Sequence, residues 1–497
     1  MMWFRRIAAI PLIIIFVVLF IGALVVTQIN NSFASPGFYN SQLQRADMYN
    51  FVYDKALPAA LDQVKTDVSP DFNLNVDAIK APVASAARKI APPEWLQTQA
   101  ETASNTIIPY FVGKTDSFTY TLVLKDRVEL ADEVVKSDII HGDAFNSLYN
   151  DGISYAADRV LQNIGTLPYS LTFSKVDIEN ALKQGIPIDW AASQASAGVD
   201  SLEAYMIGDT NHFTITIYLQ DRVAETITAL AALADQKIEA LFYSLPTCST
   251  TQFNQAVQAL STGSLPPCRP ADLTYQEFKN MFNVDARVTS SIQQIVQGQI
   301  PNQWTYTDAQ LIAKLGSKNA QTLEDMRGWI KNGYTLTQAD VRNEIAKNNG
   351  DLASFDTARH RINTVRTWLW ALWLIPFAVL ILIALLCGRN WLSRAFWGLG
   401  TLFVTSLAIY IAVTVSYAHA VEPRLTRDLF HPSEYQGVAA VMAEKGNEVI
   451  RNVAGSFASG IEWMAIYTMI GSGVVILGLI IWKVVLPRRR GTTPQNP

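Results

Sequence analysis

Histidine and acidic residues, which could do chemistry together, cluster at one place in the sequence. His419 and His431 share a short stretch with Glu422, Asp428 and Glu434. Imidazole nitrogens and carboxylate oxygens can bind zinc or exchange protons in acid–base catalysis. A solvated turn is the simpler interpretation of the same stretch, so we predict no catalytic or metal site there. A hydrolase with an unfamiliar site around these histidines is kept as an alternative.

Familiar catalytic motifs are absent from the sequence. It contains no His-Glu-x-x-His, Gly-x-Ser-x-Gly or Walker loop, and no paired cysteine–histidine spacing. The formal net charge of -4 and the pI near 5.8 provide no basic footprint for nucleic acid. We therefore expect no cofactor, no bound metal and no nucleic-acid partner, and the sequence favours a non-enzymatic protein.

Four uninterrupted apolar runs indicate an integral membrane protein. Each run is long enough to cross roughly 30 Å of hydrocarbon as a helix. None carries an ionised side chain in its interior, which argues against a proton- or sodium-driven pump. The predicted spans are Ile7 to Thr27, Trp368 to Gly388, Ala395 to Tyr417 and Trp463 to Trp482.

The flanks of these runs predict how the chain crosses the cell membrane. Basic residues follow the positive-inside rule, so both termini and the short loop at 389–394 are expected in the cytoplasm. Residues 28–367 and 418–462 are then extracytoplasmic. The first run is too long for a typical signal peptide and is interpreted as an uncleaved anchor. The basic residues of the flanks are Arg5, Arg6, Arg389, Arg394, Lys483 and Arg488 to Arg490. Aromatic residues predict belts at both membrane interfaces. The outer belt comprises Trp368, Trp370, Trp373, Tyr417 and Trp463, and the inner belt comprises Trp391, Trp397 and Trp482.

An internal repeat organises the first half of the extracytoplasmic region. Residues 95–128 align without a gap on residues 190–223, and 13 of the 34 positions are identical. Each copy is predicted to form a helix, a glycine-containing turn, a strand and a second helix. The strands begin at Phe118 and Phe213, and apolar residues alternate with threonines along each of them. Because a lone strand leaves its backbone unpaired, we expect the two strands to share one small sheet.

Several repeated residues look like parts of a site but have simpler structural interpretations. Asp126-Arg127 and Asp221-Arg222 follow the strands, so both aspartates are predicted N-caps, with Glu129 completing one capping box. Trp95 and Trp190 are predicted core aromatics near helix starts. A third copy is predicted to begin at Pro301-x-x-Trp304 and to include a strand-like remnant at Tyr334 to Thr337, followed by Asp340.

Two cysteines lie in the predicted extracytoplasmic region. Cys248 and Cys268 each accompany a proline-containing turn, and outside the cytoplasm such a pair predicts a disulfide. Cys387 lies at the inner end of a membrane run and is expected to be a reduced packing residue. An apolar stripe from Tyr435 to Phe457 recurs at helical spacing, and we expect it to dock on the ectodomain.

These features predict a helix-dominated α+β protein, with a duplicated ectodomain and a small sheet on a four-helix transmembrane region. The expected divisions are an anchor at 1–29, repeat one at 30–140, repeat two at 141–235, a helical third region with the disulfide and a stalk at 236–366, membrane helices two and three at 367–418, an outer helical loop at 419–462, and membrane helix four with a basic tail at 463–497.

The Pro-x-x-Trp to Phe-Thr-x-Thr-x-x-Leu-x-Asp-Arg unit and the Leu-Pro-Thr-Cys and Leu-Pro-Pro-Cys-Arg-Pro pair cover about a third of the ectodomain. In these motifs and its layout the chain resembles uncharacterised bacterial cell-envelope membrane proteins with an anchor, a large ectodomain and three C-terminal membrane helices. The resemblance implies no activity. Our first hypothesis is an ectodomain that binds a protein or a cell-surface component, on helices that contact the lipid bilayer and could form a homo-oligomer. The alternatives are a channel or lipid-handling accessory protein and an extracytoplasmic hydrolase.

Overall fold

Helices dominate the structure, a computed structural model that describes residues 2–67, 76–165, 167–348, 350–425 and 429–489. The described strands are short and form two small sheets, so the predicted helix-dominated α+β class is confirmed. Contacts group the chain into two units that cut across the divisions expected from the sequence. Unit 1 comprises residues 1–60, 93–122 and 335–497, and unit 2 comprises residues 61–92 and 123–334.

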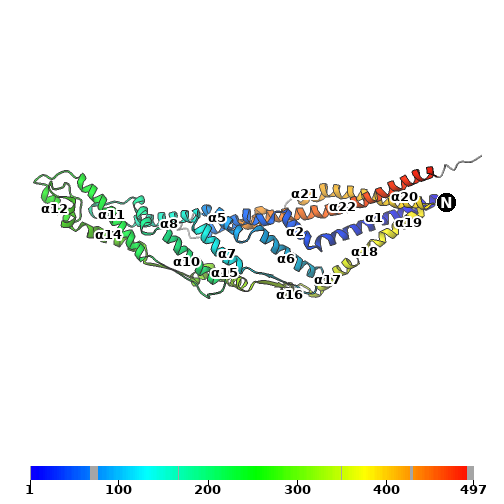
Figure 1. Ribbon diagram of the computed structural model, residues 1–497, viewed down its shortest axis with the longest axis horizontal. Helices are drawn as coiled ribbons and strands as arrows, with labels where there is room; N and C mark the ends of the chain where they lie inside the picture. The colour runs from blue at the N-terminus through cyan, green and yellow to red at the C-terminus, as the bar shows by residue number, and fades with distance from the viewer. Residues whose placement is uncertain (1, 68–75, 166, 349, 426–428, 490–497) are drawn as a thin grey trace, which may run out of the picture. The chain divides into compact units, whose positions relative to one another are not determined.

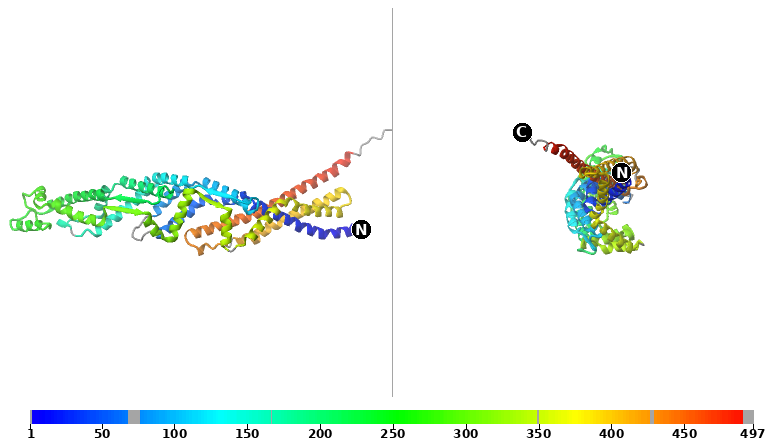
Figure 2. Two further views of the ribbon diagram at one scale, coloured as in Figure 1. Left: turned by 90° about the horizontal axis from the view of Figure 1, so that it is seen from below. Right: turned by 90° about the vertical axis from the view of Figure 1, so that its right-hand side faces the viewer.

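The described residues of unit 1 contain four helices long and apolar enough to cross a membrane. Each overlaps a predicted span, although the third ends later and the fourth begins much earlier than predicted. The apolar segments are Ala9–Phe33, Leu369–Cys387, Trp391–Leu425 and Val438–Lys483. They belong to α1 (Met2–Phe33), α18 and α19 (Leu369–Leu372 and Leu374–Cys387), α20 (Trp391–Ser416) with its continuation, and α22 (Val438–Arg489). Helix α1 packs on α19 and α22, and α20 packs on α19 and α22 (Figures 1 and 2).

Most tryptophans of the predicted belts are exposed at the ends of these helices. Trp368, Trp370 and Trp463 are exposed, as are Trp391 and Trp482 at the opposite ends. Trp373 differs, because its indole Nε1 donates to Thr27 Oγ1 at 3.2 Å and its ring packs edge-on against Phe20. Trp373 therefore joins α1 to the start of α19 rather than facing lipid alone.

Helix α22 is much longer than one membrane crossing. Its 52 residues rise about 78 Å, against roughly 30 Å of hydrocarbon. The predicted outer stripe is the first part of this helix, and it packs on the N-terminal segment of the chain: Phe457 contacts Phe33, and Ser456 bonds to Gln42 and Arg45. Gly460 makes room for Gln28, whose side-chain amide occupies the place that a Cβ would take.

The other described elements of unit 1 connect or flank these long helices. They are α2 (Pro36–Arg45), α3 (Met48–Phe51), the π-helix η1 (Val52–Ala56), the start of α4 (Leu57–Asp67), α6 (Pro93–Phe111), β1 (Thr119–Leu122), β4 (Tyr334–Thr337), α16 (Gln338–Lys347), α17 (Leu352–Thr367), the π-helix η4 (Tyr417–Val421), α21 (Glu422–Leu425) and η5 (Pro432–Glu434).

Unit 2 is built around one hydrophobic core. Leu182, Leu230, Phe242, Phe278 and Ile292 lie in it, almost fully buried. The elements of unit 2 are α5 (Val76–Ile90), α7 (Lys125–Val134), η2 (Val135–Ile140), α8 (Asp143–Gln162), η3 (Pro168–Ser170), α9 (Lys175–Gly185), α10 (Ile188–Met206), β2 (Thr214–Tyr218), α11 (Gln220–Ser244), α12 (Phe253–Ser261), α13 (Tyr275–Phe282), α14 (Val284–Gln299), β3 (Gln303–Thr307) and α15 (Asp308–Asn332).

The two repeated strands do not pair with each other, so that prediction is wrong. Strand β1 pairs with β4, and β2 pairs antiparallel with β3, with Thr216 opposite Thr305. The expectation that each strand pairs its backbone groups with another strand is nevertheless confirmed. The partners are two later threonine-rich strands, whose last residues, Thr307 and Thr337, each form a capping box with the helix that follows.

The weak third copy divides into two parts. Tyr334 to Thr337 is a strand as predicted, and Asp340 completes its capping box. Trp304 lies inside strand β3, whereas Trp95 and Trp190 lie in the first turns of α6 and α10. The third Pro-x-x-Trp is therefore not a helix start, and β3 and β4 are alike instead: Trp-Thr-Tyr-Thr and Tyr-Thr-Leu-Thr.

Candidate functional site

The repeated aromatic residues build the same structure in each unit. Phe118 contacts Tyr110 at a ring-centroid distance of 5.1 Å, and Phe213 contacts Tyr205 at 5.2 Å. All four side chains are buried. Gly113 and Gly208 follow the tyrosines with φ of 72° and 82°, the left-handed region that glycine adopts at little cost. Each copy thus forms the predicted helix, turn and strand.

An arginine from a later helix holds each of these turns. In unit 1, Arg359 of α17 donates to the carbonyls of Tyr110 and Thr115 at 2.7 and 2.8 Å. In unit 2, Arg327 of α15 donates to the corresponding carbonyls of Tyr205 and Thr210 at 2.9 and 3.0 Å. Both guanidinium groups also lie over the tyrosine rings. These buried arginines position the strands and line neither of the two cavities described below.

The prediction that Asp126 and Asp221 are N-caps, with Glu129 completing a capping box, is wrong. Asp126 and Asp221 are the second residues of α7 and α11, and Leu124 and Leu219 occupy the N-cap positions without a side-chain cap. The aspartates still lie in the first turn, where negative charge is favourable. Arg127 donates to the carbonyl of Ile90, and Arg222 pairs with Glu225.

The two repeated tryptophans lie near helix starts but are only half-buried. Trp95 and Trp190 are each the third residue of their helix, α6 and α10. The guanidinium of Arg222 lies 5.8 Å from the centre of the Trp190 ring. Neither tryptophan lines either of these cavities, and both are structural contacts of their helices.

Cys248 and Cys268 form the predicted disulfide. Their Cα atoms are 4.9 Å apart, and the bond closes a loop that contains α12. Cys248 lines a cavity of about 580 Å³ with polar neighbours, among them Asp272 and Glu277. The carboxylate of Glu277 is already engaged in the capping box of Thr274, which lowers its pKa through the hydrogen bonds it accepts. Cys387, as predicted, is a free cysteine that packs beside the membrane-helix core.

The histidine stretch is exposed. His419, His431, Glu422 and Glu434 all face solvent, and Asp428 lies outside the described residues. His419 Nδ1 lies 3.1 Å from the carbonyl of Val415 on its own helix. Within the described part of the chain, these residues form no group with metal-ligand geometry.

A lysine compensates part of the charge of a separate acidic group in unit 2. Carboxylate oxygens of Asp132, Asp200 and Glu203 lie within 4.8 Å of one another. Lys136 forms ion pairs with Asp132 and Asp200. Burial and the neighbouring carboxylate of Asp132 raise the pKa of Glu203, which favours its neutral form. Two of the three carboxylates are thus held in ion pairs with Lys136.

A cavity with an almost entirely apolar lining lies in unit 1, among the four apolar helices. We call it the α1–α20–α22 groove, and its volume is about 630 Å³. Among the described residues of its lining, Ser416 and Tyr417 supply the only polar side-chain atoms, and none is charged. The lining residues are Ile21, Leu24, Val25, Phe33, Ile409, Ala412, Val413, Ser416, Tyr417, Val421, Ile450, Val453, Ala454, Phe457, Ala458 and Ile461.

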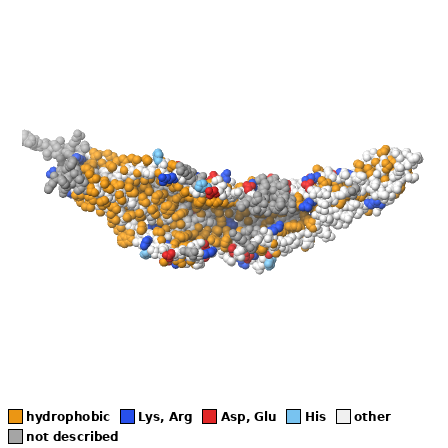
Figure 3. Space-filling view, turned by 180° about the vertical axis from the view of Figure 1, so that it is seen from behind, with side chains coloured by type: hydrophobic (Ala, Val, Ile, Leu, Met, Phe, Trp, Pro, Cys, Tyr) orange, Lys and Arg blue, Asp and Glu red, His pale blue; other side chains and the backbone are white. Residues whose placement is uncertain are grey.

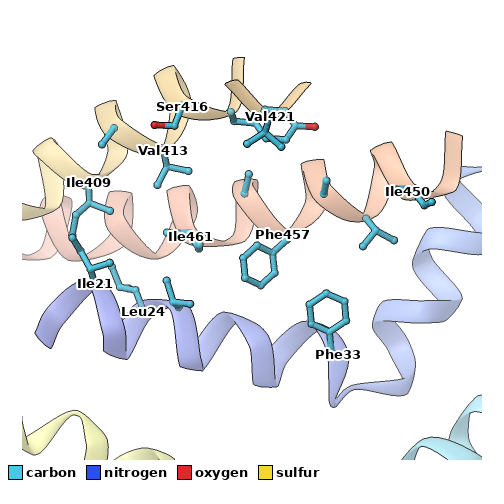
Figure 4. Close-up of a pocket in the computed structure, with 16 residues that line it drawn as sticks. Ile21, Leu24, Phe33, Ile409, Val413, Ser416, Val421, Ile450, Phe457 and Ile461 are labelled. Carbon is cyan, nitrogen blue, oxygen red and sulfur yellow. The ribbon is translucent and has the colours of Figure 1, made fainter. Parts of the chain in front are cut away.

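Three helices shape the groove. In Figure 4, α22 runs between α1 and α20, and the labelled side chains of all three point into the space they share. Phe33 of α1 and Phe457 of α22 meet at a centroid distance of 5.9 Å. Figure 3 shows hydrophobic side chains covering the same helical part of the chain, so the groove belongs to a larger apolar surface.

A glycine and a π-helical segment give the groove its local geometry. Helix α20 changes at Ser416 into η4, whose Tyr417 and Val421 line the groove. The hydroxyl of Tyr417 would lie 3.0 Å from a Cβ at Gly455 of α22, so the phenol crosses this helix where no side chain intervenes. π-Helical turns often accompany functional sites in helices.

The sequence contained signals for parts of this arrangement that were not used. The apolar stripe of α22 was noticed, but the groove also needs Phe33 and the π-turn, which no periodicity predicts. Arg327 and Arg359 follow Glu324 and Asp356 at the same spacing of three residues, and both pairs form ion contacts. That shared spacing was the available signal for the two arginines.

Known proteins supply no relative from which the role of the groove could be inferred. No family model, curated protein or solved structure matches the chain. The four apolar helices indicate a membrane protein, and all four belong to unit 1.

Proposed function

We propose that this protein is a lipid-handling membrane protein, and that the α1–α20–α22 groove binds the acyl chain of a membrane lipid. The observation that carries the proposal is the groove's lining, which is almost entirely apolar on all three helices and contains no charged side chain among the described residues. Its volume of about 630 Å³ lies within the roughly 300–1,000 Å³ of typical ligand pockets.

The dimensions of the groove suit one chain of a lipid. Along α22 the lining extends from Ile450 to Ile461, which corresponds to about 17 Å of helix. One leaflet of a bilayer has a hydrocarbon thickness of about 15 Å, half of the whole core. An extended acyl chain therefore matches the groove in length and polarity, and the neighbouring hydrocarbon is its immediate source.

The proposal includes the orientation expected from the sequence, with both termini in the cytoplasm and the large domain outside. The disulfide supports this orientation, because such bonds persist in oxidising compartments. The groove is lined by the ends of α1 and α20 that lead toward the extracytoplasmic segments, so it faces the outer leaflet.

The other hypotheses find less support. Buried side chains fill the centre of the helix bundle, among them Phe16, Phe20, Ile383 and Ile409, which disfavours a channel along its axis. The exposed histidine stretch gives no support to a hydrolase. Binding of a protein or an envelope component by the ectodomain stays a prediction, as does a homo-oligomer.

Groove-filling substitutions test the proposal. Ala454→Trp and Ala458→Trp place a large ring in the groove, while Ala439→Trp makes the same change at an exposed position of α22. Native mass spectrometry of the full chain, released from membranes in mild detergent, counts the lipids that remain bound. We expect wild type and Ala439→Trp to retain lipid and the two groove variants to lose it. Equal retention in all four proteins would refute lipid binding in the groove.

A further inference from the structure

A carboxylate marks where the groove leaves the hydrocarbon. Glu462 of α22 accepts a hydrogen bond from Thr414 Oγ1 of α20 at 2.9 Å, and the exposed Trp463 follows it. An ionisable side chain deep in hydrocarbon is costly, and tryptophan favours the membrane interface. The Thr414–Glu462 pair therefore lies at the interface.

Most of the groove lies beyond this pair. On α22 every lining residue, from Ile450 to Ile461, precedes Glu462, on the side away from the membrane-crossing residues. On the neighbouring helix, Ser416, Tyr417 and Val421 come after Thr414, on the same side. The apolar floor thus continues about 17 Å past the interface, which is as long as one leaflet is thick.

An empty apolar floor outside the bilayer would be unfavourable. Apolar surface in contact with water costs about 25 cal/mol per Å², and each methylene transferred out of water contributes about 0.8 kcal/mol. Within the hydrocarbon the same lining would gain little from a lipid chain, because lipid already surrounds it. An acyl chain therefore gains the most free energy in the outer part of the groove, where it covers apolar surface that would otherwise contact water.

From this we propose, building on the lipid-binding function above, that the groove holds an acyl chain withdrawn from the outer leaflet. The occupant is a lipid with a long acyl chain, raised along α22 so that its chain lies beyond the Thr414–Glu462 pair. The protein then extracts or transfers lipid, in contrast to a protein that merely binds an annular lipid at its membrane surface.

Site-specific photocrosslinking tests the position of the chain. Benzoylphenylalanine replaces Val413, at the interface level, or Val453, about 14 Å beyond Glu462 along α22. Asn452 adjoins Val453 but is absent from the groove lining, and it serves as the matched control. Each full-length variant is reconstituted in vesicles of phosphatidylethanolamine and phosphatidylglycerol, checked for folding by size exclusion, irradiated, and analysed by intact mass.

We expect phospholipid adducts at both Val413 and Val453, and several-fold fewer at Asn452. Adducts at Val413 alone would overturn withdrawal while leaving lipid binding at the membrane level intact. Adducts at neither position would overturn withdrawal and contradict the proposed function. Equal labelling of Val453 and Asn452 would show unspecific contact and overturn the inference.

The mass of the adduct identifies the source of the chain. A second set of vesicles also contains oleate, so that free fatty acid and phospholipid compete for the groove. A phospholipid mass at Val453 supports withdrawal of a bilayer lipid. An oleate mass alone would overturn withdrawal of bilayer lipid and assign the outer groove to a free fatty acid.

Discussion

The guanidinium of Arg359 lies 3.9 Å from the centre of the Tyr110 ring, and its Nε donates to the carbonyl of the same tyrosine at 2.7 Å. Arg327 and Tyr205 repeat this relationship at 3.7 and 2.9 Å in the other unit. One residue thus satisfies two carbonyls of a turn and covers an aromatic ring.

Replacing these arginines should loosen each turn separately. In Arg359→Lys, a single ammonium group cannot reach both carbonyls with the planar geometry of guanidinium, and leaving a buried carbonyl unpaired costs about 2 kcal/mol. We expect faster hydrogen exchange at residues 111–116 in Arg359→Lys and at 206–211 in Arg327→Lys. Arg361→Lys, at an exposed position of α17, is the control. Faster exchange at both turns in either variant would contradict independent roles.

The paired turn glycines should differ in their tolerance of a side chain. A Cβ at Gly113 would lie 2.5 Å from the backbone carbonyl oxygen of Arg359, whereas at Gly208 the nearest atom is Cδ of the flexible Lys331, at 2.7 Å. Both have positive φ, which costs about 1–2 kcal/mol with a side chain. Gly113→Ala should therefore lower the midpoint of thermal unfolding in detergent more than Gly208→Ala.

Gly152 in α8 supplies the opposite control for the glycine pair. A Cβ at this position would meet no other atom within 4 Å, and the φ of Gly152 is not positive. Gly152→Ala should leave stability unchanged or raise it by up to about 1 kcal/mol, because alanine favours helix. If Gly208→Ala proved more damaging than Gly113→Ala, the backbone clash would not be the cause.

The disulfide provides a test of membrane orientation. An impermeant phosphine applied to intact cells should reduce Cys248–Cys268, and an impermeant maleimide should then label both cysteines. Cys387, at the predicted inner end of its helix, should be labelled only after permeabilisation. Labelling of Cys248 and Cys268 that requires permeabilisation would place unit 2 in the cytoplasm.

The ion pair between Arg342 and Asp356 should make unit 1 sensitive to acid. Two hydrogen bonds from the guanidinium, at 2.8 and 3.0 Å, hold the pKa of Asp356 below its ordinary value of 3.8. The stabilisation is thus complete above that value and is lost as the pH falls through the lowered pKa. Asp356→Asn should lower stability at neutral pH and weaken its acid dependence, measured by hydrogen exchange in α16 and α17. An unchanged acid dependence would contradict this role.

Local sequence patterns were sufficient to predict the membrane-crossing helices and strands β1 and β2. The four apolar runs end within a few residues of the observed segments on most flanks, because hydrophobic length is a local property. Strand pairing was not local: Thr121 finds Thr335 more than two hundred positions along the chain, and alternation alone cannot select that partner. The groove was missed for the same reason, since Phe33, Val421 and Ile450 come from three distant segments.

The nested strand pairing also constrains the order in which the protein can be made. The sheet and the arginine contact of unit 2 can form once the chain has been synthesised to Asn332. Strand β1 of unit 1 can pair only after β4 has been synthesised, and its turn can be held only after Arg359 has been added. Since domains generally fold as units during synthesis, the inner stretch of the chain can mature first. Unit 1, which includes the N-terminal helix α1, cannot complete its packing until translation reaches the final helices. A polypeptide truncated late in the chain would therefore contain a folded unit 2 and an incompletely folded unit 1.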